Sequence, residues 1–179
     1  MRIGLFFGSF NPIHIGHIAI AKYMLKATDL DQVWLVVSPK NPLKNKNVLA
    51  DAKKRLRQVK KAIGKSTGIK VSNVEFALPQ PSYTIRTLRF LSKKHPQKEF
   101  VLIIGSDNLQ LFHKWKEYKN ILAGYKIYVY PRKNSVGGKL RNHASVKMTK
   151  APLINVSSTF IREQVGMGKD VKHLIPKIR

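Results

Sequence analysis

The chain has 179 residues, 43% of them apolar, which is typical of one folded domain and excludes an intrinsically disordered chain. It has no cysteine, so disulfide bonds and thiolate metal sites are excluded, and no stretch approaches the roughly 18 apolar residues of a membrane span. The first apolar run, residues 3–7, is too short for the apolar region of a signal peptide, so we expect a cytoplasmic protein.

The chain is strongly basic, because it has 34 Lys and Arg but only 9 Asp and Glu, which gives a formal net charge of +25. One explanation is nucleic-acid binding through contacts to phosphates. The other is a lysine-rich composition spread over solvated surfaces, since 25 of the 34 are lysines and they run from Lys22 to Lys177 without a dominant block. We favour the second explanation and expect no nucleic-acid partner. With either explanation, the positive electrostatic potential of the protein would attract an anionic substrate.

Short apolar runs alternate with segments of helical periodicity along the whole chain. Strands are expected over residues 3–7, 33–37, 70–76, 100–104, 126–130 and 153–156, the last after a loop rich in Lys, Asn and Gly. Helices are expected over residues 15–26, 52–63 (capped by Asp51) and 84–94, and from a cap at Ser157 or Ser158 to residue 165.

This alternation predicts an α/β fold of the Rossmann-like, doubly wound type, with a mostly parallel sheet and helices on both faces. No linker or repeat interrupts it, so we expect a single domain over residues 1–179. In such sheets, ligands bind at the carboxyl ends of the strands, near the point where the strand order reverses. The conspicuous glycine and polar residues follow four predicted strands, which end at positions 7, 37, 104 and 156.

The first of these strand ends leads into the stretch GSFNPIHIGH. Gly8 would let the backbone approach a ligand, and the helix that begins soon afterwards would turn its N-terminal amides toward an anion. His14 and His17 would share one face of that helix, with Gly16 leaving room between them. One histidine as a helix cap and the other as a core residue is the alternative. The pair has neither the usual spacing of four nor a carboxylate nearby, so it suits phosphate oxygens better than a metal ion.

This stretch resembles the signature of the nucleotidyltransferase superfamily, whose H-x-G-H core is shared with class I aminoacyl-tRNA synthetases. The full ten-residue form is similar to that of the small adenylyltransferases. The segment KMTK, residues 147–150, resembles the second signature of the synthetases, but 179 residues leave no room for their other domains. We interpret KMTK as an ordinary strand-edge sequence.

Near the other end of the chain, SSTFIR, residues 157–162, is similar to the ISSTxIR segment of the same superfamily, with Val156 in the first position. Hydroxyls and amides at the start of a helix can bind phosphate oxygens, and an arginine in its first turns, here Arg162, can neutralise them. Alone, the pattern is a common helix cap. Together with H-x-G-H it becomes a strong sign of the resemblance, which implies a site for the phosphates of ATP.

Three further stretches resemble those of bacterial nicotinate mononucleotide adenylyltransferases, in the same order along the chain. SPKNPLK, residues 38–44, is similar to their proline-rich stretch that ends in P-H-K, with Leu43 in place of the histidine. PSYTIRTL, residues 81–88, is similar to P-S-Y-T-x-x-T-L, and residues 105–115 are similar to the G-x-D…W region. Arg132-Lys133 departs from the family's Arg-Pro-Gly after the fifth strand.

The resemblance implies transfer of AMP from ATP to nicotinate mononucleotide, giving deamido-NAD and pyrophosphate in NAD biosynthesis. The implied catalytic residues are His14, His17, Lys44 and Arg162. The implied ATP site comprises Gly8, Ser9, Phe10, His14, His17, Gly105, Asp107, Ser157, Ser158, Thr159 and Arg162, and the implied mononucleotide site comprises Ser9, Lys44, Tyr83, Thr84, Asp107 and Trp115. Mg²⁺ would enter with ATP rather than occupy a site made by the protein alone.

The motif positions imply a role for each group. The two histidines would contact the α-phosphate, the SSTFIR segment would hold the β- and γ-phosphates, and Lys44 would be a second phosphate clamp. Backbone amides near Thr84 would bind the nicotinate carboxylate, and Trp115 would stack on the pyridine ring. Nicotinamide mononucleotide or phosphopantetheine as acceptor, or a basic nucleic-acid-binding protein on this scaffold, stay open as alternatives. The oligomeric state stays open as well, with a homo-oligomer among the options.

Overall fold

The computed structural model describes residues 1–40 and 49–177, and its centre is one six-stranded sheet. The strand order is β3-β2-β1-β4-β5-β6, and every neighbouring pair is parallel. The strands are β1 (Arg2–Gly8), β2 (Gln32–Val37), β3 (Ile69–Ser72), β4 (Glu99–Gly105), β5 (Lys126–Tyr130) and β6 (Val146–Met148). The helices are α1 (Ile15–Ala27), α2 (Ala52–Ile63), α3 (Thr84–Lys94), α4 (Ser106–Gln110), α5 (Tyr118–Gly124) and α6 (Ser158–Gly166).

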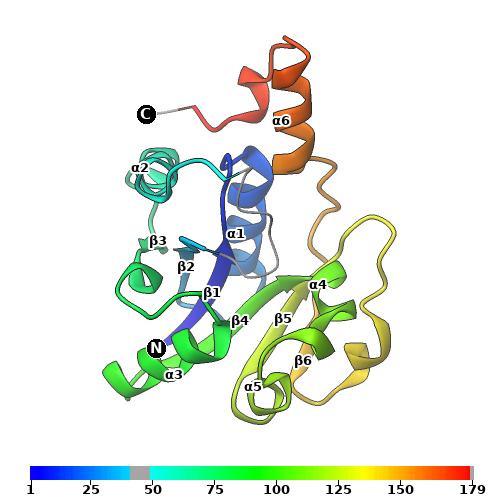
Figure 1. The fold of residues 1–179 in the computed structure, drawn as a ribbon. Coiled ribbons are helices and arrows are strands. Elements are labelled where there is room, and N and C mark those ends of the chain that lie inside the picture. The colour runs from blue at the N-terminus through cyan, green and yellow to red at the C-terminus, as the bar shows by residue number, and fades with distance from the viewer. Residues whose placement is uncertain (41–48, 178–179) are drawn as a thin grey trace.

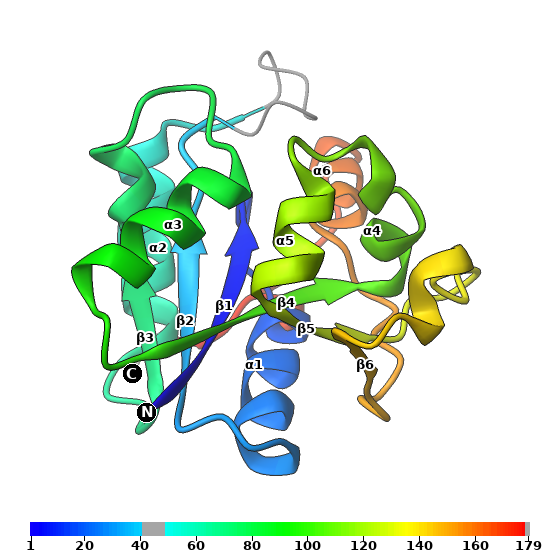
Figure 2. The ribbon, with the colours of Figure 1, turned by 90° about the horizontal axis from the view of Figure 1, so that it is seen from below.

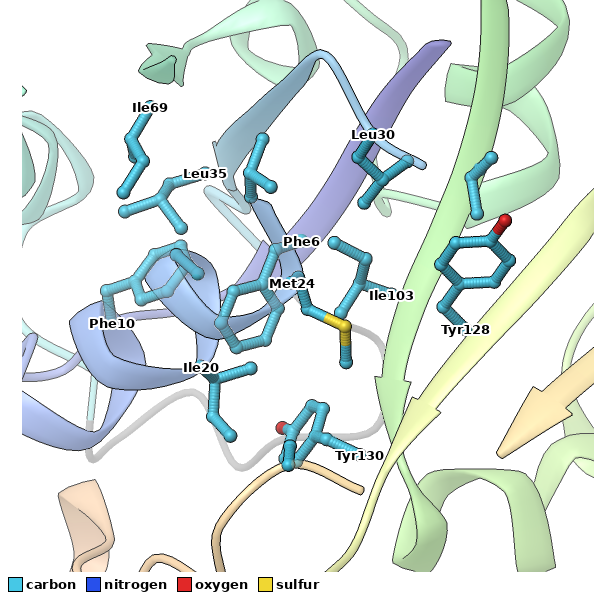
Figure 3. Packing of buried hydrophobic residues seen from close by; sticks show 14 of the residues in the cluster. Phe6, Phe10, Ile20, Met24, Leu30, Leu35, Ile69, Ile103, Tyr128 and Tyr130 are labelled. Atoms are coloured by element: carbon cyan, nitrogen blue, oxygen red, sulfur yellow. The ribbon is translucent and has the colours of Figure 1, made fainter. Parts of the chain in front are cut away.

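Each central strand contributes to two cores, because successive side chains point to opposite faces of a sheet. On one face, α1 and α2 cover a cluster that includes Phe6 and Leu35 (Figures 1 and 3). On the other face, α3, α4 and α5 cover a cluster that includes Leu5 and Leu102, and Figure 2 shows α3 and α5 in front of the sheet. The predicted doubly wound fold with helices on both faces is therefore confirmed, and the sheet is parallel throughout.

Two helix starts have the predicted caps. The Asp51 carboxylate accepts a hydrogen bond from the Lys54 amide at 2.8 Å, and the Ser157 hydroxyl accepts one from the Phe160 amide at 3.1 Å. Both bonds satisfy backbone donors that the first turn of a helix leaves without a partner. Across the described residues, no helix is both long and apolar enough to span a bilayer.

The predicted strand over residues 153–156 is wrong. These residues form no strand in the described part of the chain, Leu153 is 59% exposed, and the preceding Pro152 has no amide hydrogen to donate. The free edge of β5 is taken instead by β6, whose flanking residues bond to β5 through the Ser145 carbonyl and the Thr149 amide. β6 contains Lys147 and Met148, so the interpretation of KMTK as strand-edge sequence is confirmed.

The predicted strand over residues 70–76 is half right. β3 ends at Ser72, and residues 74–76 form a 3-10 turn. The Ser72 hydroxyl accepts a hydrogen bond from the Val74 amide at 3.3 Å, and this local bond competes with continued strand pairing. The turn carries Glu75, a carboxylic acid that is almost completely buried.

Candidate active site

The candidate site lies where the strand order reverses. The chain runs outward from β1 to β2 and β3, then crosses back to β4 on the other side of β1. The carboxyl ends of β1 and β4 therefore diverge into loops on opposite sides, which is where parallel sheets of this type bind ligands. Gly8 ends β1 and Gly105 ends β4, so both glycine-containing stretches found in the sequence lie at this point.

The loop after β1 is built on Phe10. This residue has a positive φ of 46°, and its ring is buried against Phe6 at 6.0 Å between ring centroids (Figure 3). A Cβ at position 8 would lie 2.8 Å from the Phe10 ring, so only glycine fits there. That Gly8 lets the backbone approach a ligand stays a prediction, and the structure adds that this glycine leaves room for the Phe10 ring.

The two histidines stack on each other at the start of α1. Their ring centroids are 3.7 Å apart, with 27° between the ring planes. The backbone amide of His14 donates to Nδ1 of His17 at 3.2 Å, so the proton of a neutral His17 ring is on Nε2. This bond also ties the His17 ring to the helix start, which gives that ring one fixed orientation.

His14 is the more buried of the two. It is 2% exposed, and its Nδ1 has no hydrogen-bond partner among the described residues. Burial, and secondarily the positive charge of Arg132, lowers the pKa of His14 to about 4. At neutral pH His14 is therefore an uncharged imidazole that can exchange hydrogen bonds but brings no positive charge.

Gly16 brings a distant segment close to the histidines. A Cβ at this position would lie 2.4 Å from Cγ2 of Ile154 and 3.0 Å from Nδ1 of His14. The extended residues before α6 therefore pass directly over the first turn of α1. That Gly16 lets a nucleotide pack against the first turn stays a prediction, and in the structure Ile154 and the His14 ring lie against this position.

Helix α6 closes onto the loop that carries the histidines. The Ser158 hydroxyl donates to the Pro12 carbonyl at 2.9 Å, and Nη1 of Arg162 donates to the Asn11 carbonyl at 2.7 Å. Nη2 of Arg162 donates to the Thr159 hydroxyl at 3.1 Å. Two stretches that lie about 150 residues apart in sequence are thereby joined into one site.

The loops after β4 and β5 form the next wall. A Cβ at Gly105 would lie 2.3 Å from Oδ1 of Asp107, whose carboxylate is also 4.0 Å from Nε of Arg132. The Arg132 guanidinium lies over the Tyr130 ring, 5.3 Å from its centroid. A narrow cavity at this point is lined by Phe6, His14, Gly16, His17, Ile20, Tyr130, Arg132 and Ile154.

Arg132 was missing from the predicted site residues. Its position two residues after β5 was the available signal, since most of the predicted functional residues follow strand ends. Its guanidinium faces the histidine pair closely enough to lower the pKa of His14. It adds a cationic group, suited to phosphate, to the cavity that the histidines line.

A second residue missed by the sequence analysis, Arg55 of α2, holds two loops in place. It is 1% exposed and donates to four backbone carbonyls at 2.5–3.0 Å, those of Ser9, Ser38, Pro39 and Ala50. The signal was its spacing of four from the buried Val59, which places an arginine on the buried face of a basic helix.

Of the predicted mononucleotide residues, Tyr83 and Trp115 pack against the core on the face of the sheet that α3 covers. Tyr83 and Thr84 start α3 without a side-chain cap, which leaves first-turn amides able to bind an anion. The ring of Trp115 packs on Phe112 at 4.9 Å between ring centroids. Nζ of Lys116, the next residue, lies 4.7 Å from the centroid of the Tyr83 ring, so the two segments are adjacent. Lys44 lies outside the described residues.

Another hollow, of about 720 Å³, opens at the opposite, amino-terminal edge of the sheet. Its polar lining includes Arg2, whose guanidinium is already paired with the carboxylates of Asp29 and Glu99. This neutralised cluster is far from the histidine loop in the fold, so we place the candidate site at the carboxyl edge.

Comparison with known proteins identifies the family of this chain. A family model described as cytidylyltransferase-like matches residues 5–164. The chain is 50% identical to the "Probable nicotinate-nucleotide adenylyltransferase" of Flavobacterium psychrophilum, over 98% of this chain and 92% of that protein. It is 49% identical to the protein of the same name from Cytophaga hutchinsonii, over 99% and 92%. The nicotinic acid mononucleotide adenylyltransferase of Plasmodium falciparum, solved with NaAD, has a similar fold, with a TM-score of 0.80, 17% identity and coverage of 96% of this chain and 87% of that one.

Proposed function

Because the chain belongs to the cytidylyltransferase-like family and, within it, to the nicotinate-nucleotide adenylyltransferases, we propose that it transfers AMP from ATP to nicotinate mononucleotide in the cytoplasm. The products are deamido-NAD and pyrophosphate, and the reaction belongs to NAD biosynthesis. The observation that carries the proposal is the pair of hydrogen bonds from Ser158 and Arg162 to the loop of His14 and His17. It supports one anion site built from both ends of the chain.

The chemistry needs no protein nucleophile. An oxygen of the mononucleotide 5′-phosphate forms a bond to the α-phosphorus of ATP, while the bond from that phosphorus to the bridging oxygen of pyrophosphate breaks. The attacking phosphate is already anionic near neutral pH. The protein therefore acts by aligning the two substrates and by stabilising the charge that develops on the phosphate oxygens.

The histidine pair would act on the α-phosphate. His17, with its proton on Nε2, would donate to an α-phosphate oxygen, and its bond from the His14 amide would keep the ring aimed. His14 is uncharged at neutral pH because its pKa is about 4, so it would contribute a hydrogen bond rather than a charge. Arg132 would supply positive charge to the same cavity.

The triphosphate would lie at the start of α6. Ser158 and Arg162 each use a donor to hold the histidine loop, so phosphate binding would use the remaining guanidinium donors and the first-turn amides of α6. Ser157 caps the helix, and Thr159 is exposed at its start. Gly105 and Asp107 would contact the nucleoside from the end of β4.

Mg²⁺ would arrive with ATP. The groups that line the cavity at the histidine pair include imidazole and guanidinium groups, which suit phosphate oxygens, and the carboxylate in the adjoining wall, Asp107, lies 4.0 Å from Nε of Arg132. Mg²⁺ prefers carboxylate, water and phosphate oxygens. When bound to the triphosphate, Mg²⁺ would neutralise part of its charge. The residues named above would hold the phosphate oxygens that the metal leaves free.

The mononucleotide would bind between α3 and Trp115. First-turn amides near Thr84 would receive the nicotinate carboxylate, Trp115 and Tyr83 would flank the pyridine ring, and Lys44 would clamp the 5′-phosphate. Two nearby cations, Arg86 and Lys116, lie against the Tyr83 ring and make this end attractive to an acid.

The test is pyrophosphate release from ATP and Mg²⁺ with nicotinate mononucleotide, nicotinamide mononucleotide or phosphopantetheine as the acceptor. We expect strong preference for nicotinate mononucleotide. Preference for another acceptor would reject nicotinate mononucleotide as the substrate, but it would leave the role of the histidines in AMP transfer unchanged. No release with any acceptor from the folded protein would reject the activity and return attention to the basic surface.

A further inference from the structure

Glu75 is a buried acid that the reaction as described above does not use. It lies in the 3-10 turn between β3 and α3 and is 1% exposed. Its Oε1 accepts a hydrogen bond from the Thr87 hydroxyl at 2.8 Å, and its Oε2 has no hydrogen-bond partner in the described part of the chain. Burying a carboxyl group with an unsatisfied oxygen costs free energy, so the fold alone gives little reason for an acid here.

Three segments converge on this carboxyl group. Thr87 is in the first turns of α3, Ser82 is in the turn before α3, and Ser38 follows β2. Burial raises the pKa of Glu75, and the polar side chains of Ser38, Thr87 and Ser82 oppose that rise. The Ser82 amide also donates to the Lys40 carbonyl at 3.2 Å, which joins the turn to the end of β2.

The contacts continue from Ser38 into the ATP half of the site. The Ser38 carbonyl accepts from Nη1 of Arg55 at 2.9 Å, and the same nitrogen donates to the Ser9 carbonyl at 2.5 Å. Ser9 is in the loop that leads to the histidines. Hydrogen bonds therefore join Thr87 to Glu75 and join Ser38 to Ser9 through Arg55, and the effect of Ser38 on the pKa of Glu75 relates these two buried groups.

We propose that Glu75 is a positioning residue that fixes the start of α3, the anion-binding end for the mononucleotide, relative to the end of β2. It touches neither substrate. Glu75 acts through Thr87, whose hydroxyl it holds by a hydrogen bond. Thr87 is about one helical turn after the amides near Thr84 that would receive the nicotinate carboxylate. This inference rests on the proposed function in one respect, which is that the mononucleotide binds at α3.

The role predicts a selective effect on one substrate. Glu75→Ala removes the acceptor for Thr87 and frees the start of α3, so we expect the KM for nicotinate mononucleotide to rise about tenfold or more. The KM for ATP should change less than twofold, because the histidine loop keeps its bonds to Arg55 and α6. Glu75→Gln retains an oxygen acceptor for Thr87 and should recover most of the loss.

The experiment compares four variants with the wild-type enzyme. Thr87→Val keeps the shape of the side chain and removes the donor, so it should raise the same KM in the same direction. Glu99→Ala is the matched control, since it removes an acid from the amino-terminal edge of the sheet and should leave both KM values unchanged. Thermal melts establish that each variant is folded, and Glu75→Gln and Thr87→Val carry the test if Glu75→Ala does not fold.

Calorimetric titration of nicotinate mononucleotide separates this inference from the proposed function. Wild-type protein that binds the mononucleotide without turnover would reject the activity, while the variants' Kd values would still test the positioning role. Wild-type protein that does not bind it would reject both. Folded variants whose mononucleotide KM and Kd match the wild type, or whose ATP and mononucleotide KM values rise equally, would overturn the role of Glu75.

Discussion

His17 is held by backbone on one side and by aromatic rings on the other. Its Nδ1 accepts the His14 amide, and its ring stacks at 3.7 Å on His14 and lies 4.9 Å from Phe10, measured between centroids. A side chain fixed in this way is a preorganised donor, and preorganised donors stabilise developing charge without reorganising during the reaction.

We predict that His17→Ala lowers kcat by about 10² or more, the effect of losing one preorganised donor. Steady-state pyrophosphate release measures the change, and thermal melting checks that the variant is folded. His143→Ala, at an exposed position far along the chain, is the matched control and should keep wild-type turnover. Turnover of His17→Ala within threefold of wild type would contradict the assigned role.

The burial of His14 makes a prediction about stability and pH. Its pKa in the folded chain is about 4, and a histidine in the unfolded chain is protonated near pH 6.5. Between these two values the unfolded state binds more protons, so stability falls as the pH drops from 6.5 toward 4, by up to ~3 kcal/mol. His14→Gln should flatten this part of the dependence. Denaturant unfolding at pH 7, 6 and 5 measures it, and equal slopes in the two proteins would refute the assignment.

At the scale of elements, the site depends on how α1 and the segment before α6 fit together. Gly16 is inside α1, where alanine would ordinarily favour the helix by about 1 kcal/mol. Here a Cβ would press on Ile154 and on the His14 ring. The need for contact between two distant segments therefore overrides local helix propensity at this position.

We predict that Gly16→Ala destabilises the fold and reduces turnover, and that Ile154→Ala in the same chain recovers part of both losses. Double-mutant unfolding should give a coupling of about 1 kcal/mol. Gly124→Ala is the matched control, because a Cβ at this helical position has no atom within 4 Å, and it should be neutral or stabilising. If the effects of the two substitutions on the free energy of unfolding are additive, the predicted contact between positions 16 and 154 does not affect stability.

The elements differ in how well the sequence predicts them, and burial explains the difference. β1, β2, β4 and β5 are covered on both faces, so they are continuous apolar runs that stand out from the chain. β6 has three residues at the edge of the sheet and no buried position, so it is not a continuous apolar run, and only its motif-like KMTK letters drew attention to it. The apolar letters of residues 153–156 imitate a strand, but the sheet edge they would need is already occupied.

Sequence patterns identify the site residues that follow strand ends. They do not identify buried residues that support the site loops without lining the site. The histidine and SSTFIR stretches are both recognisable in sequence, and the hydrogen bonds of Ser158 and Arg162 join them. Arg55 and Glu75 support the loops through backbone carbonyls and a buried hydroxyl. Such contacts depend on the packing of α2 and α3, which no local pattern describes.

At the scale of the whole molecule, the excess of positive charge is mostly unpaired. Within residues 1–40 and 49–177, the ion pairs involve Arg2, Arg89, Lys126 and Arg132, out of a total of 34 Lys and Arg in the chain. Like charges on one surface repel and destabilise the compact state, and salt screens this repulsion.

We predict that the melting temperature rises when NaCl is raised from about 20 mM to about 300 mM, because the Debye length falls from roughly 20 Å to below 10 Å. Chloride is preferred to sulfate, which also strengthens burial of apolar surface and would confuse the comparison. A melting temperature that falls or stays constant would mean that the positive side chains are too dispersed to repel one another measurably.

The joining of the first loop to the last helix also has a consequence for synthesis on the ribosome. β1 is made first and lies in the middle of the sheet, but its neighbour β4 begins 97 residues later than β1, and α6 later still. A nascent chain released after β5 can bury most of its strands, yet it lacks the donors that fasten the histidine loop. Incomplete translation products should therefore be partly ordered but inactive. Enzymatic activity should appear only when roughly the final tenth of the chain has left the ribosome.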